Sequence, residues 1–139
     1  MRTLGVAFVA VLLAGCSLFA PSGIQVTIPA GSGTRALPVT VVDHAGIVAG
    51  AGPAQAAAPQ DWSRGEVQAV AGRDDAVLVT WVGGSCDDRA IITIDADGDR
   101  YTVVVESRSS AMGCNAMGIF RSVFLTLSRP TRADAFTMS

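Results

Sequence analysis

Residues 90–105, with the sequence AIITIDADGDRYTVVV, decide the fold of this chain. Two runs rich in Ile, Thr and Val, 90–94 and 101–105, flank a short stretch of Asp, Ala and Gly. β-Branched residues favour strands, and Asp and Gly tolerate the backbone angles of a tight turn. The sequence therefore predicts a β-hairpin whose turn is 95–99.

The same composition and a two-residue period recur on both sides of this hairpin. Strand-like segments are 24–28, 38–43, 46–48, 66–71, 76–82, 120–128 and 135–138. No stretch of ten residues after position 16 has the period of an amphipathic helix. We therefore predict an all-β fold, a small antiparallel β-sandwich or barrel of about six to eight strands, preceded by a helical signal segment. Trp81, central in 76–82, is expected in the core.

Composition narrows the function classes. The 139 residues suit one domain, and 16% are charged, against roughly 25% in an average soluble domain. The ten basic residues are all Arg and form no run, which argues against nucleic-acid binding. His44 is the only histidine, and its strand neighbour Asp43 would point to the opposite face. We expect neither an enzyme nor a bound cofactor.

The N-terminus carries the clearest motif. The apolar run 4–14 (LGVAFVAVLLA) is too short to span a bilayer and is typical of a secretion signal. The Leu13-Ala14-Gly15-Cys16 sequence that ends this segment resembles the lipobox of bacterial lipoproteins. The resemblance implies that Cys16 becomes the first residue and carries a diacylglycerol with acyl chains such as palmitate. Two alternatives remain open, an ordinary cleaved signal and an uncleaved anchor extended through 17–20.

These features divide the chain into a signal peptide (1–15), a lipidated cysteine with a flexible tether (16–36) and a β-domain (37–139). The segment 24–28 alternates like a strand, so a strand inside the tether is the alternative there. We expect the protein at the cell envelope, held by lipid on the outer face of the plasma membrane, or at the outer membrane if the cell has one.

Two cysteines remain after Cys16. Because an oxidising exterior favours disulfides, a Cys86–Cys114 bond is expected, with two free thiols as the alternative. The segments 38–43 and 81–87, together with Cys114, Gly118 and Arg121, also resemble a group of uncharacterised small actinobacterial lipoproteins. That resemblance implies a shared fold and a paired cysteine couple, without an activity. The abundance of Ala, Gly and Arg and the absence of Lys are consistent with an actinobacterial source.

Three weaker site hypotheses come from the loops. Asp95, Asp97 and Asp99 have the spacing of the first calcium ligands of an EF-hand, but Arg100 stands where Gly is needed. An acidic hairpin turn explains the same residues and is the preferred interpretation. A soft copper site could use His44 with the sulfur-bearing residues Met112, Cys114 and Met117, which conflicts with the disulfide. Trp62 and Arg121 are candidates for a binding surface.

Together these observations predict an envelope lipoprotein, monomeric, that acts as a non-catalytic binding or structural module toward an envelope protein or polymer. Rival hypotheses are a small-ligand or metal-handling lipoprotein, and an inhibitor of a secreted hydrolase. The loops around Cys86 and Cys114 would form the contact surface.

Overall fold

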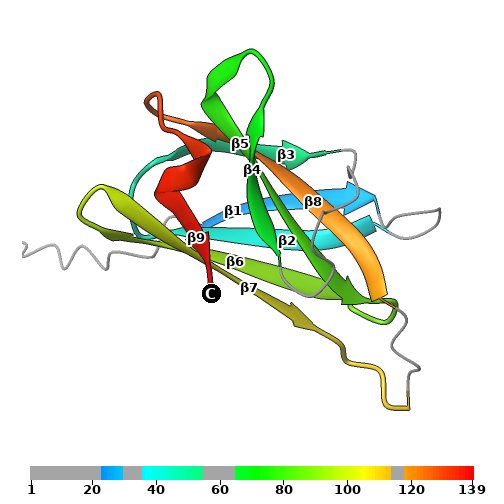
Figure 1. Cartoon of the computed structure of the whole chain (residues 1–139). Helices are drawn as coiled ribbons and strands as arrows, with labels where there is room; N and C mark the ends of the chain where they lie inside the picture. Colours follow the sequence, from blue (N-terminus) through cyan, green and yellow to red (C-terminus); the bar gives the residue numbers. More distant parts are fainter. Residues whose placement is uncertain (1–22, 30–35, 55–64, 114–117) are drawn as a thin grey trace, which may run out of the picture.

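The computed structural model describes residues 23–29, 36–54, 65–113 and 118–139. Within these ranges the chain forms nine strands and one short 3-10 helix (Figure 1). The elements are β1 (Gly23–Pro29), β2 (Ala36–Asp43), β3 (Val48–Pro53), β4 (Glu66–Val70), β5 (Arg73–Gly84), β6 (Arg89–Asp97), β7 (Arg100–Arg108), β8 (Gly118–Leu127), η1 (Ala133–Ala135) and β9 (Phe136–Met138).

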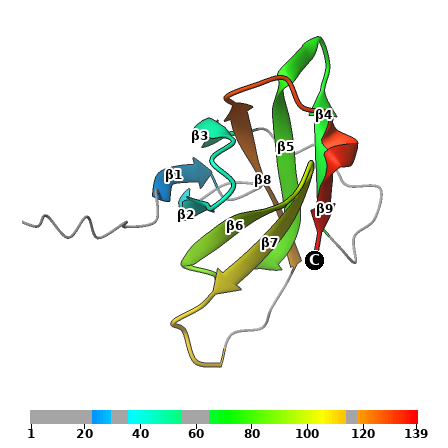
Figure 2. The same cartoon turned by 90° about the vertical axis from the view of Figure 1, so that its left-hand side faces the viewer.

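The strands form two sheets packed face to face. One sheet has the order β1-β2-β6-β7-β9 and the other has the order β3-β8-β5-β4. Figure 2 shows β6 and β7 in one layer, with β4 and β5 in the other. The all-β sandwich expected from the sequence is confirmed, and the sheets do not close into a barrel.

The pairing differs from a purely antiparallel sandwich in two places. β6 and β7 form the expected antiparallel hairpin, with Gly98 at φ 62° in its turn, a conformation that favours glycine. β2, however, pairs with β6 in parallel, and β9 pairs with β7 in parallel. Parallel partners need a long connection, and here β3, β4 and β5 occupy the second sheet between β2 and β6.

Alternating residues of both sheets fill the core, as a two-residue side-chain period requires. Fully buried side chains come from the first sheet (Leu37, Val39, Val41, Ile92, Ile94 and Val103) and from the second (Val77, Val79, Val123 and Leu125). Trp81 is 4% exposed, which confirms its expected place in the core. At the C-terminal edge, Phe136 stacks on Tyr101 with ring centroids 4.9 Å apart, and so attaches β9 to the sandwich.

β1 lies within the range 16–36 that the sequence predicts as a tether. Ile24 and Val26 pack against the core, and Ile28 is buried in it. The strand pairs along its length with β2. The part of this range from Gly23 to Pro29 therefore belongs to the sheet, because its alternating apolar residues have a core face to cover.

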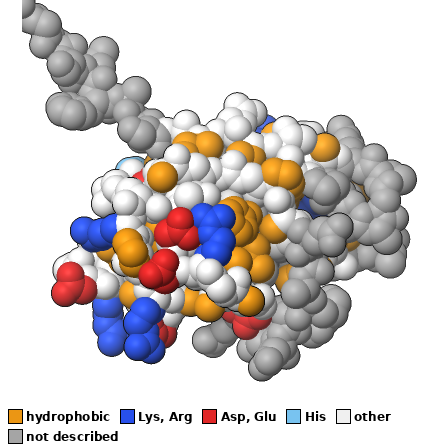
Figure 3. All heavy atoms as spheres, turned by 90° about the horizontal axis from the view of Figure 1, so that it is seen from above, with side chains coloured by type: hydrophobic (Ala, Val, Ile, Leu, Met, Phe, Trp, Pro, Cys, Tyr) orange, Lys and Arg blue, Asp and Glu red, His pale blue; other side chains and the backbone are white. Residues whose placement is uncertain are grey.

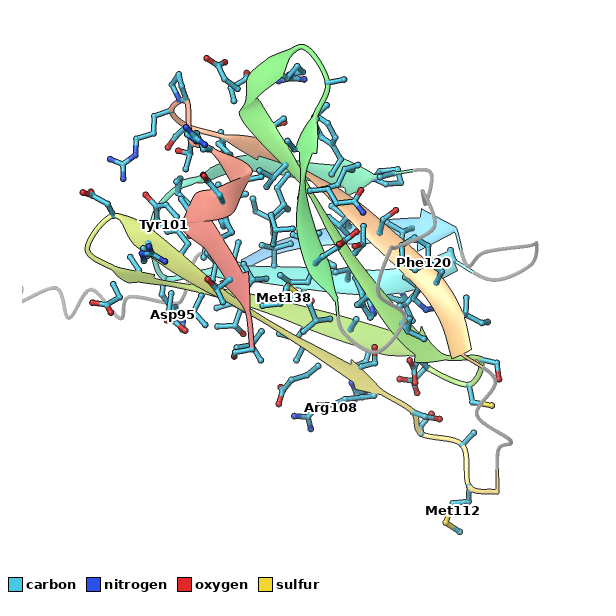
Figure 4. The ribbon with its side chains drawn as sticks, in the orientation of Figure 1. Asp95, Tyr101, Arg108, Met112, Phe120 and Met138 are labelled. Carbon is cyan, nitrogen blue, oxygen red and sulfur yellow. The ribbon has the colours of Figure 1, made fainter. Side chains whose placement is uncertain are left out.

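The strand directions define two ends of the sandwich. The turn 85–88 and the segment 109–113 adjoin the paired ends of β6 and β7 at Arg89 and Arg108, and we call them the loop end. The turn 98–99 lies at the other end of the same strands, the hairpin end. Figure 4 shows Asp95 near the hairpin end and Met112 at the far tip of the loop end. None of the described segments is a helix of the length and apolarity needed to cross a bilayer.

Candidate functional site

A buried arginine occupies the inner face of the second sheet near the loop end. Arg121 on β8 pairs across the strands with Trp81 on β5, and it is 3% exposed. The expectation of a surface role for Arg121 is therefore wrong. Its position in β8 has the same parity as Val123, Leu125 and Leu127, so the two-residue period directs its side chain inward with theirs.

Most N–H groups of the Arg121 guanidinium have no hydrogen-bond acceptor among the described residues. Nη2 donates to the backbone oxygen of Gly84 at 3.3 Å. Nε and Nη1 are buried and have no acceptor. Burial lowers the pKa of Arg121, and the negative charge of Asp87 opposes that shift. The chain thus keeps a buried cation whose remaining N–H groups have no acceptor among the described residues.

Gly83 makes room for three polar side chains beside this cation. A Cβ atom at Gly83 would lie 2.7 Å from Oδ2 of Asp87, 3.2 Å from Nε of Arg121 and 3.3 Å from Oγ of Ser107. Since all three distances start from one point, no two of these atoms are more than about 6.5 Å apart. Glycine at position 83 therefore permits side chains of the turn 85–88, β7 and β8 to converge.

A pocket of about 530 Å³ lies next to this cluster, between the two sheets. The described residues that line it are Gly65, Trp81, Val82, Val105, Ser107, Met138 and Ser139. The indole nitrogen of Trp81 donates to Oγ of Ser107 at 3.2 Å. Trp81 and Ser107 thus belong both to the pocket wall and to the surroundings of Arg121.

Hydrogen bonds to two carboxylates hold the loop end together. The carboxylate of Asp87 accepts the Gly84 N–H at 2.6 Å, and that of Asp88 accepts the Ser110 N–H at 3.0 Å together with the Ser110 hydroxyl. The hydrogen bonds from Ser110 lower the pKa of Asp88. Asp88 therefore ties the segment 109–113 to the turn 85–88.

Met112 extends from this segment into solvent. It is 98% exposed and is the only exposed large hydrophobic side chain in the part of the chain that the structure describes. Figure 4 shows it beyond Arg108, away from both sheets.

The acidic hairpin does not assemble as a cation site. Asp95 pairs with Nδ1 of His44 at 2.8 Å, across the sheet from β6 to the residue after β2. Asp97 and Asp99 are exposed. Within the four described ranges, no group of three or more His, Cys, Asp or Glu side chains is arranged to hold a metal ion.

Charged side chains elsewhere pair with each other. Arg73 binds Asp75 at 2.8 Å on β5, and Arg132 binds Asp134 at 2.8 Å near η1. Figure 3 shows basic and acidic side chains side by side on the face seen from above. Since Arg73 and Arg132 already pair with carboxylates, we do not assign them to a site.

Several predicted residues lie outside the described ranges. These are Cys16, Trp62, Cys114 and Met117. Their lipid, surface, disulfide and copper roles stay predictions. Cys86 is described, in the turn between β5 and β6.

Sequence reasoning missed Ser107 and Asp87. The signal for Asp87 was the Gly83-Gly84 pair that ends β5, because two glycines in succession leave space for a nearby side chain. Ser107 could have been found from the period of β7, which places it on the face of Val103 and Val105.

No family model matches this chain, and neither a curated protein nor a solved structure matches it.

Proposed function

We propose that the chain is a lipid-anchored protein of the cell envelope whose β-sandwich acts as a non-catalytic binding module. Its contact surface is the loop end, and its partner is another envelope protein. The observation that carries this proposal is Met112, a fully exposed apolar side chain on a segment that hydrogen bonds hold in place. A pre-ordered loop with an apolar tip loses little conformational entropy on binding.

The strand order supports an outward orientation of this surface. Gly23 pairs with Val42, and Val42 pairs with Thr93, so β1 begins toward the hairpin end. Six residues lie between Cys16 and Gly23, so the seven residue steps span at most about 25 Å. Thr93 is the midpoint of β6, so this reach extends to either end of the strand. The direction in which the chain enters β1 favours a lipid on the side of the hairpin end, with the loop end facing away from the membrane.

The expected disulfide fits the same end of the molecule. Gly84 pairs with Gly118, which brings the end of β5 to the start of β8. Cys86 follows Gly84 by two residues, and Cys114 precedes Gly118 by four. A bond between the two cysteines would cross-link the turn 85–88 to the chain that follows the segment 109–113, and so would stiffen the contact surface.

Site-specific photo-crosslinking in intact envelopes tests the proposal. A benzophenone amino acid is placed at Met112 of the full-length protein, and the control carries it at Asp97, exposed at the hairpin end. We expect a discrete crosslinked product from position 112 that excess wild-type protein suppresses and Met112→Asp protein does not.

Crosslinking of equal yield and pattern from both positions, or none from position 112, would contradict the proposed contact surface. An unchanged competition by Met112→Asp would contradict the role of the methionine itself.

A further inference from the structure

We propose that the pocket between the sheets binds a small carboxylic acid with an apolar body, and that Ser107 and Arg121 select its carboxylate. The inference goes beyond the proposed contact with an envelope protein, because it adds a small-molecule ligand. It uses a cavity beside the loop end rather than Met112, so the two proposals can fail separately.

The hydroxyl of Ser107 supplies the first contact. Its oxygen accepts the Trp81 indole N–H, so its own hydrogen is left to donate. None of the described residues accepts that hydrogen. Because Ser107 lines the pocket, an oxygen of a bound ligand can take this bond without displacing another partner.

Arg121 supplies the preference for an anion. Its Nε lies within about 6.5 Å of Oγ of Ser107, on the strand adjacent to Trp81. A buried donor without an acceptor costs free energy, and more so when it carries charge. Arg121 is not among the described residues that line the pocket, so a carboxylate bonded to Ser107 would compensate this cation by its charge across that distance.

Asp87 does not already fulfil that role. It forms no ion pair with Arg121, and its Oδ2 accepts the Gly84 N–H. Asp87 is partly buried whereas Arg121 is fully buried, so water screens the negative charge more than the positive one. The cluster therefore retains a net attraction for a second anion on its buried side.

The rest of the pocket fits an apolar body. Trp81, Val82, Val105 and Met138 form most of its described wall. A volume of about 530 Å³ lies in the range of small-molecule sites. The ligand class is thus a monocarboxylic acid with a short hydrocarbon portion.

Nuclear magnetic resonance titration of the full domain tests this proposal with octanoate, and with 1-octanol and octylammonium as neutral and cationic counterparts. The readout is the Trp81 indole N–H signal, assigned through Trp81→Phe, because that N–H donates to Ser107. We expect a saturable shift with octanoate and binding about tenfold tighter than that of 1-octanol.

Two variants separate the contributions of the side chains. Ser107→Ala and Arg121→Met are each expected to weaken octanoate about tenfold while 1-octanol changes less than twofold. If Arg121→Met does not fold, Ser107→Ala carries the test alone. A missing shift with octanoate, or equal affinities for the three probes, would overturn the proposal, and crosslinking from position 112 would be unaffected by that result.

Discussion

Buried Arg121 and its neighbour Asp87 give the sharpest stability prediction, because removing the Asp87 charge should cost more than removing the Arg121 cation. Removing the Asp87 charge through Asp87→Asn leaves Arg121 buried without its nearest negative charge. Replacing the cation through Arg121→Met removes N–H groups that have no acceptor among the described residues and retains a side chain of similar length. Removing one of two charges is costly when the charge that remains is buried, which is the case for Arg121 after Asp87→Asn. After Arg121→Met the charge that remains is the partly exposed Asp87.

The magnitude follows from the geometry. Oδ2 of Asp87 and Nε of Arg121 are at most about 6 Å apart, and at an effective dielectric constant of about 20 two unit charges at that distance attract by about 3 kcal/mol. Since Asp87 is only partly buried and water screens its charge, we expect Asp87→Asn to cost about 1–2 kcal/mol. Arg121→Met should cost less than about 1 kcal/mol, or stabilise the fold.

Urea unfolding followed by circular dichroism measures both effects. With a slope of about 2 kcal/mol per molar, Asp87→Asn should lower the midpoint by about 0.5–1 M. Asp97→Asn, at the exposed hairpin turn, is the matched control and should leave the midpoint unchanged. The reasoning is refuted if Arg121→Met costs more than Asp87→Asn, or if the Asp97 control shifts as much as Asp87→Asn.

Three further predictions concern packing, pH and the cysteines. Gly65→Ala should destabilise the fold by about 2 kcal/mol in the same assay, because the new Cβ would lie 2.6 Å from the Thr80 backbone oxygen. Gly52→Ala is the control and should be nearly neutral, because nothing lies within 4 Å of its Cβ position. Equal effects of the two substitutions would contradict the close packing before β4. Folding lowers the pKa of Asp88 below its ordinary value of 3.8. Its hydrogen bonds to Ser110 therefore stabilise the segment 109–113 fully above pH 3.8, and this stabilisation is lost as the pH falls through the lowered pKa of the folded state. Hydrogen exchange of the Ser110 amide should show this loss, and a similar profile in Asp88→Asn would exclude Asp88 as its cause. Reduction of the purified domain should remove about 3.5 kcal/mol if Cys86 and Cys114 close a loop of about 28 residues, and an unchanged melting temperature would reject the bond.

Local sequence patterns predicted the features that depend only on residues close together in the chain. The hairpin of β6 and β7 followed from two β-branched runs and a turn with Gly98. Trp81 was placed in the core from its apolar neighbours, and it is buried there. These features depend on residues close together in the chain, so a two-residue period suffices to find them.

Pairings between distant segments could not be obtained in this way. The parallel contact of Val39 with Ala90 depends on which strands share a sheet, and no local pattern specifies that. The convergence of Ser107, Asp87 and Arg121 likewise depends on β7, the turn 85–88 and β8 meeting at Gly83. Arg121 was a candidate for a binding surface, although its alternation with Val123 indicated the inner face.

Mass spectrometry of the N-terminal peptide from membrane-extracted protein tests the central claim most directly. The account predicts a mature chain that begins at Cys16 and carries the mass of a diacylglycerol on its sulfur. A chain that retains residues 1–15, or begins at another residue with an unmodified Cys16, would contradict the lipid attachment and with it the outward orientation of the loop end.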